Sequence, residues 1–205
     1  MLHKVAIDLP YRNRTKTVNR SPMPRNLPPM KPKDAFSHSA MHEAGHVAAC
    51  ISLRLQFREV NLRPPRKYTG IVEGIARQVD EAMSTGVFTP ELERQSTSLV
   101  IMSFAGPVCD ALSAGRKSFE INRYDDLNPV LDIIENRFAN NSVRMAFTHY
   151  CEAEAFALFE EDTRLWRFTQ QLAKELEQKK KMTYEQCLEF YNQEYFVESW
   201  VRKEE

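Results

Sequence analysis

Hydrophobic residues recur at intervals of three and four along most of this chain, which is the spacing of one buried helical face. The first such stretch predicts a helix from Asp34 to Leu55. The same spacing predicts later helices over 89–114, 129–138, 142–161 and 163–180, and a last helix that begins at Thr183. Residues 99–112 are apolar on almost every side, so their helix should be central and buried.

The pattern changes to alternation after the first helix. Phe57–Arg63 alternates between apolar and polar residues, as a strand does, and Tyr68–Ala76 is the expected hairpin partner. Residues Gln78–Phe88 show neither period and are predicted to form a loop. The predicted fold class is therefore mostly α-helical, with one small β-ribbon after the first helix.

Several helix ends carry recognisable signals. Thr89 before Pro90 is a typical N-cap followed by proline in the first turn. Thr183 and Gln186 have the spacing of a capping box. Pro107 cannot donate a backbone hydrogen bond, so we expect it to kink or divide its helix, and we expect Gly115 to end that helix.

The first 33 residues differ in composition from the rest. They hold six of the eleven prolines, and eight basic residues against one acidic residue, while the whole chain has a formal charge of zero. Such a stretch favours an extended, solvated arm over 1–33, which leaves 34–205 as the folded helical domain. A basic arm can also touch nucleic acid, but nothing else in the chain points to that partner.

Composition narrows the class of protein further. Apolar residues make up 42% of the chain and charged residues 27%, as in ordinary soluble domains. No uninterrupted apolar run approaches the roughly 18–20 residues of a membrane span, and the N-terminus lacks the apolar core of a secretory signal. The four cysteines are widely spaced without a C-x-x-C pair, so we expect buried reduced thiols, a cytoplasmic location and no membrane contact.

One motif in the sequence indicates a catalytic metal site. Residues 42–46 read HEAGH on the first predicted helix, so His42 and His46 lie one turn apart on the same face and can reach one metal ion. Glu43 is offset by one residue, in place to accept a proton from water polarised by that ion and to return it to a leaving amine. The motif therefore predicts a zinc site with Glu43 as the general base.

A catalytic zinc site needs a third protein ligand. The candidates are Asp110, Glu120, Asp125, Asp126, His149, Glu152 and Glu154. Asp125 and Asp126 precede a helix, where aspartate often serves only as a cap. Glu152 and Glu154 would complete a site of two histidines and one glutamate, whereas His149 is expected to be a partly buried helix residue. Spacing alone does not choose among these residues.

Two later segments extend the pattern. Residues 104–112 read FAGPVCDAL and residues 124–127 read YDDL. In this order, after HEAGH, they resemble the peptidase domain of FtsH-type ATP-dependent zinc proteases, which has an AGRxAEEL-like helix and then an Asn-Asp-Leu segment whose aspartate is the third zinc ligand. The resemblance covers about residues 34–140. It implies a helical zincin-type metallopeptidase domain with Zn²⁺ bound by His42, His46 and Asp126, followed by C-terminal helices over 141–205.

The chain also departs from that family. It contains no G-x-x-x-x-G-K-[ST] loop, so it lacks the ATPase motor. The family's Gly-Arg pair becomes Gly106-Pro107, and its Glu-Glu pair becomes Asp110-Ala111, so any supporting carboxylate on that helix must be Asp110. Without a motor, the expected substrate is a peptide or a flexible protein segment, including one delivered by a separate partner.

Two other functions compete with the peptidase hypothesis. One is a non-catalytic zinc-binding interaction or regulatory module, which would have no use for a base at Glu43. The other is a helical adaptor whose basic arm binds nucleic acid, with affinity that falls steeply with salt. The sequence does not define the oligomeric state or the cleavage preference.

Overall fold

The computed structural model describes residues 38–62, 77–78, 81, 85, 89–119, 127–160 and 163–201. The predicted arm over 1–33 lies outside this part of the chain, as does the predicted hairpin partner Tyr68–Ala76. Within the described residues the secondary structure is mostly helical, with one two-stranded sheet. This confirms the prediction of a mostly α-helical fold.

Six helices and two short strands have defined bounds in the part of the chain that the structure describes. They are α1 (His38–Ser52), β1 (Glu59–Asn61), α3 (Pro90–Ser113), α4 (Asn128–Arg137), α5 (Asn141–Glu160), α6 (Thr163–Lys179), β2 (Lys181–Thr183) and α7 (Tyr184–Val201). Each predicted helix is present, with ends that differ by a few residues. The predicted loop Gln78–Phe88 is wrong where it can be checked, since Gln78, Glu81 and Thr85 are helical.

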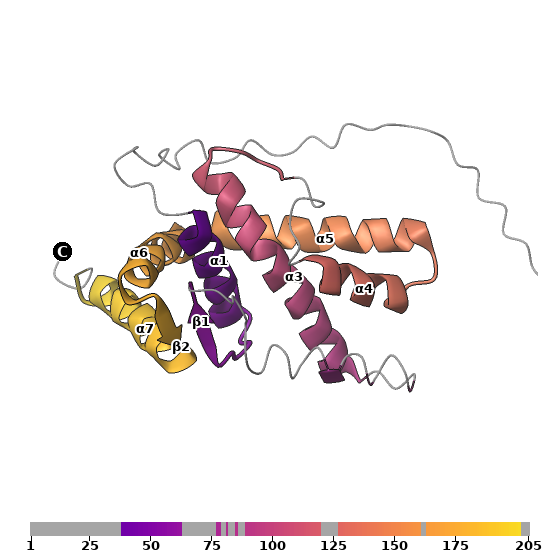
Figure 1. Cartoon of the computed structure of the whole chain (residues 1–205), viewed down its shortest axis with the longest axis horizontal. Helices are drawn as coiled ribbons and strands as arrows, with labels where there is room; N and C mark the ends of the chain where they lie inside the picture. The colour runs from indigo at the N-terminus through magenta and orange to yellow at the C-terminus, as the bar shows by residue number, and fades with distance from the viewer. Residues whose placement is uncertain are drawn as a thin grey trace, which may run out of the picture.

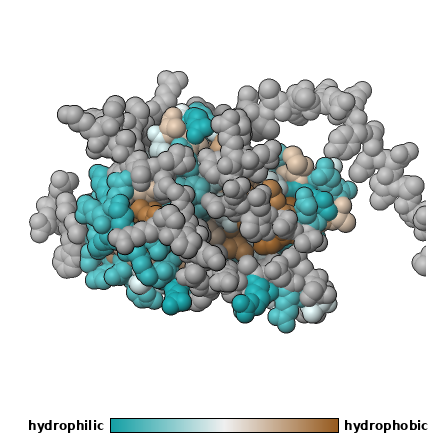
Figure 2. Space-filling model, viewed as in Figure 1, coloured by the Kyte–Doolittle hydropathy of each residue, from teal (hydrophilic) through white to brown (hydrophobic). Residues whose placement is uncertain are grey.

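Helix α1 is the centre of the packing. It packs against α3 on one side and α6 on another, and α3 in turn packs against α5 (Figure 1). Nearly all of α1 from Ala40 to Ile51 is buried, because its small residues allow neighbouring backbones to approach closely. The face shown in Figure 2 is hydrophilic over α6 and α7 and exposes hydrophobic residues mainly near the middle of the molecule.

The ribbon joins segments that are far apart in the sequence. Strand β1 pairs antiparallel with β2, with Val60 opposite Met182, and both of these residues are 1% exposed. β2 leads directly into α7 through the predicted capping box. The Thr183 backbone N–H donates to Gln186 Oε1 at 2.9 Å, and the Gln186 backbone N–H donates to Thr183 Oγ1 at 3.4 Å. The ribbon therefore ties the C-terminal helix to the chain that follows α1.

Helix α3 is the long buried helix that the apolar run predicts. The Thr89 side chain accepts a hydrogen bond from the Leu92 backbone N–H at 3.1 Å, and Gly115 follows the helix with φ of 68°, so both predicted ends are confirmed. Pro107 lies inside α3 without dividing it. By length and composition α3 could cross a membrane, but 83% of its most apolar window is buried inside the protein, as in the core helix of a folded domain.

Candidate metal centre

The HEAGH residues lie on α1 where it faces α3. His42 is 7% exposed and His46 is 3% exposed, so both rings are held inside the protein. A buried imidazole needs hydrogen-bond partners, and the partners decide which ring nitrogen carries the proton. Both histidines find a partner on α3.

His46 is oriented by the backbone of α3. Its Nδ1 lies 2.8 Å from the carbonyl oxygen of Met102. A carbonyl oxygen can only accept, so Nδ1 carries the hydrogen and donates it. In the neutral ring the lone pair is then on Nε2, which is the ring atom that can coordinate a metal ion.

His42 is oriented by a carboxylate. Its Nδ1 lies 2.7 Å from Asp110 Oδ2, and Asp110 is 3% exposed. The Nδ1–H donates to the carboxylate, which again leaves the lone pair on Nε2. A histidine that donates one ring N–H to a carboxylate while the other nitrogen binds metal is a common arrangement in zinc sites. Asp110, a candidate ligand from its residue type alone, therefore lies behind His42 and orients its ring.

The two Nε2 atoms converge. They lie 3.1 Å apart, with ring centroids 4.7 Å apart and ring planes inclined by 76°. When both Nδ1 atoms carry the hydrogen, two lone pairs face each other at this distance, and neither neutral ring can donate to the other. Two nitrogen ligands about 2.0–2.1 Å from one tetrahedral zinc ion are about 3.3 Å apart, so the pair fits such an ion with little movement.

Three residues of α3 form one stripe against the histidines. Met102, Gly106 and Asp110 follow one another at intervals of four, so they share a face of the helix. The outer two hold the Nδ1 atoms, and Gly106 lies beside the Nε2 atoms. A Cβ at Gly106 would lie 2.4 Å from His46 Nε2 and 2.8 Å from His42 Nε2. The stripe on α3 thus matches the one-turn spacing of the histidines on α1.

A second glycine sets the distance between the helices. A Cβ at Gly45 would lie 2.8 Å from the Ala105 carbonyl oxygen and 2.7 Å from Cys109 Sγ. Only glycine permits this contact, which explains a helix-weakening residue inside the motif. Burial, and then the neighbouring Asp110 charge, raise the pKa of the Cys109 thiol well above its usual value, so the thiol stays protonated.

Glu43 shares the buried environment of the histidines. The residue is 6% exposed, although a carboxylate is costly to remove from water. It follows His42 directly on α1, so it is part of the same turn of helix. The site therefore places two imidazoles and one further carboxylate on a single buried segment.

The other predicted ligands fall into two groups. Glu120, Asp125 and Asp126 lie outside the described residues. His149, Glu152 and Glu154 lie on α5, where the His149 side chain is 64% exposed and its Nδ1 is 3.4 Å from Glu152 Oε2. The expectation that His149 is partly buried is therefore wrong. In the part of the chain that the structure describes, no three histidine, cysteine or acidic side chains lie together as a metal-binding group, so Glu152 and Glu154 do not join the histidines.

Two contributors were not predicted from the sequence. The Met102 carbonyl could not be found, because a backbone group has no residue type. In the sequence, Gly106 stands out only as the residue before Pro107. One sequence signal could have pointed to this stripe: Met102, Gly106 and Asp110 are spaced four residues apart, as are the two histidines.

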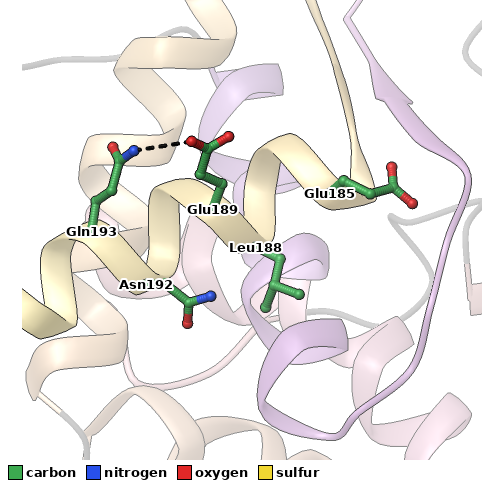
Figure 3. A pocket seen from close by; sticks show the side chains of 5 residues that line it. All are labelled: Glu185, Leu188, Glu189, Asn192 and Gln193. Atoms are coloured by element: carbon green, nitrogen blue, oxygen red, sulfur yellow. Dashed lines mark hydrogen bonds between the residues drawn. The ribbon is translucent and has the colours of Figure 1, made fainter.

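An open hollow lies elsewhere, along one face of α7. It is lined by Glu185, Leu188, Glu189, Asn192 and Gln193, and Gln193 donates to Glu189 at 3.3 Å (Figure 3). All five residues come from one helix and none is a predicted site residue. The hollow therefore does not compete with the histidine pair as a catalytic site.

No family model, curated protein or solved structure matches this chain.

Proposed function

We propose that this protein is a zinc-dependent peptidase of the helical zincin type, in which His42 and His46 bind the ion, Asp126 is the third ligand and Glu43 is the general base. One observation carries the proposal. The two Nε2 atoms converge to 3.1 Å while partners on α3 engage both Nδ1 atoms. This is the arrangement of a histidine pair prepared to bind one cation.

The residues divide the chemistry between them. Zinc, when bound, polarises a carbonyl group and lowers the pKa of water from about 15.7 towards about 7. Glu43 accepts the proton of the attacking water and passes it to the amine nitrogen as the peptide C–N bond breaks. Met102 and Asp110 hold the two Nδ1–H groups and keep both rings in the required tautomer.

Asp126 is proposed from its neighbour and from the resemblance. Leu127, the next residue, is fully buried in the same apolar core as the residues of α1 and α3. The YDDL segment resembles the Asn-Asp-Leu segment of FtsH-type proteases, where the aspartate is the third ligand. None of the acidic residues that the structure describes forms a three-ligand group with the histidines, so we take the ligand from this segment, which lies outside the described residues.

The position of Glu43, directly after the first histidine of the motif on α1, favours an enzyme over a purely structural zinc module. A structural zinc site is closed by four protein ligands and needs no base next to them. The substrate that suits a chain without an ATPase motor is a peptide or a flexible protein segment.

The test is Glu43→Gln, assayed with zinc and an unstructured protein substrate. We expect the variant to bind zinc as wild type does and to lose cleavage by about 10²-fold or more, because the base is removed and the ligands remain. Glu91→Gln is the matched control, since Glu91 is on the exposed first turn of α3 and contacts Arg94. Equal cleavage by wild type and Glu43→Gln would reject the peptidase proposal. Zinc binding without cleavage in the wild type would favour the non-catalytic module.

A further inference from the structure

We propose that Gly106 is a positioning residue of the zinc site, whose missing side chain leaves the room that an ion between His42 and His46 requires. The inference deepens the proposed function and rests on its zinc-binding part. It starts from the position that a Cβ would take at Gly106, which is 2.4 Å from His46 Nε2, 2.8 Å from His46 Cδ2 and 2.8 Å from His42 Nε2.

The ion and such a methyl group would compete for the same space. An ion about 2.0–2.1 Å from both nitrogens lies only about 1.3 Å from the midpoint of the line joining them. The hypothetical Cβ lies about 2.1 Å from that midpoint, so a methyl group there would exclude the ion from the side of the histidine pair that faces Gly106. Ordinary contact distances between non-bonded heavy atoms start at about 3.5 Å, so the methyl group would also crowd both Nε2 atoms.

The rings cannot move aside without cost. Their Nδ1 atoms are held by the Met102 carbonyl and the Asp110 carboxylate, one turn before and one turn after Gly106 on the same helix. A ring that rotates away from a methyl group at residue 106 therefore loses its partner on α3 or separates the two Nε2 atoms. Either movement removes the pairing that binds the ion.

Comparison with Gly45 and Gly115 distinguishes the role of Gly106 at the zinc site from the effects that glycine has on helix packing and backbone strain. A Cβ at Gly45 would meet a backbone carbonyl and a buried thiol, so that glycine governs how closely the helices pack. Gly115 has φ of 68° with nothing within 4 Å of a Cβ, so alanine there strains the backbone at the end of α3 without touching the histidines. Gly115→Ala is thus the matched control for a strained but site-independent substitution.

The experiment compares wild type, Gly106→Ala and Gly115→Ala in the full chain. Zinc affinity is measured by competition with a chromophoric chelator, Co²⁺ binding by its visible absorption, and folding of the metal-free proteins by circular dichroism and thermal unfolding. We expect Gly106→Ala to keep the fold but to bind zinc at least about 10-fold more weakly and to alter the Co²⁺ spectrum, because ligands that lose their orientation typically lose this much affinity. Gly115→Ala should bind both ions as wild type does.

Each outcome decides between the two proposals. If wild type binds neither ion, the proposed zinc site fails. If wild type and Gly106→Ala bind zinc equally well, only the role of Gly106 fails. If Gly106→Ala does not fold, the double variant Gly106→Ala/His46→Ala decides, because removing the ring nearest the methyl group should restore folding. Failure of the double variant to fold would overturn the inference.

Discussion

Asp110→Asn tests whether the carboxylate behind His42 prepares that ring for an ion. In the wild type, a buried Nδ1–H donates to a buried carboxylate over 2.7 Å. Hydrogen bonds to charged groups contribute about 1.5–3 kcal/mol, and those between neutral groups about 0.5–1.5 kcal/mol. Asparagine keeps the shape and an accepting oxygen but loses the charge, so the difference is about 1 kcal/mol. Zinc affinity should fall by roughly 5-fold.

Asp110→Ala extends the series. It leaves the His42 Nδ1–H without this acceptor in a buried site, which costs about 1–3 kcal/mol and permits the ring to turn. We expect zinc affinity to fall by about 10–100-fold, in the range found for lost supporting carboxylates. The predicted order of affinity is therefore wild type, then asparagine, then alanine.

The assay is a zinc titration in competition with a chelator, with thermal unfolding of each metal-free protein measured in parallel. Glu93→Gln is the control, because it removes a charge from the same helix and weakens the contact with Arg137 without touching the histidines. It should leave zinc affinity unchanged. If Asp110→Asn and Asp110→Ala bound zinc as tightly as wild type, Asp110 would be a packing residue and the reasoning would be refuted.

Two further predictions concern the fold. Gly45→Ala should lower the stability of the metal-free protein by about 1–3 kcal/mol, seen in chemical denaturation, because a new methyl group would meet the Ala105 carbonyl; unchanged stability would contradict the close contact of α1 and α3. Burial raises the pKa of three thiols to about 12, those of Cys50, Cys151 and Cys187. The native protein should therefore react slowly with a thiol reagent at pH 8 and rapidly once unfolded, and it should lose stability as the pH rises above 9, where the unfolded chain releases protons that the native state retains. Rapid reaction of the native protein would contradict the burial of these side chains.

The helices could be predicted from the sequence because their signals are local. Thr89 caps α3 through a bond to a residue three positions later, and Gln186 closes its box with Thr183 in the same way. The strand Phe57–Arg63 was predicted in the same way and contains β1, but the partner of β1 could not be predicted, because β1 pairs with a three-residue strand about 120 positions later. So short a strand carries no periodicity, and its pairing depends on how α1, α6 and α7 pack.

In the candidate site, too, the features with local sequence signals could be predicted, and the contacts between distant segments could not. His42, Glu43 and His46 were found because one helical turn determines their spacing. Asp110 is a candidate ligand from its residue type, but only the resemblance suggests a supporting role for it. Nothing along the chain shows that its carboxylate reaches His42 across 68 residues. The Met102 carbonyl and the room beside Gly106 depend on the crossing of two helices, which appears only once both are packed together.

The central claim is that His42 and His46 together bind one zinc ion. The most direct measurement is the zinc content of purified protein, loaded with zinc and then dialysed, for wild type, His46→Ala and His149→Ala. His149 is the matched control because its side chain is exposed on α5, outside the pair. We predict about one zinc ion per chain in wild type and His149→Ala, and a loss of bound zinc in His46→Ala. Equal zinc content in all three proteins, or none in the wild type, would contradict the account.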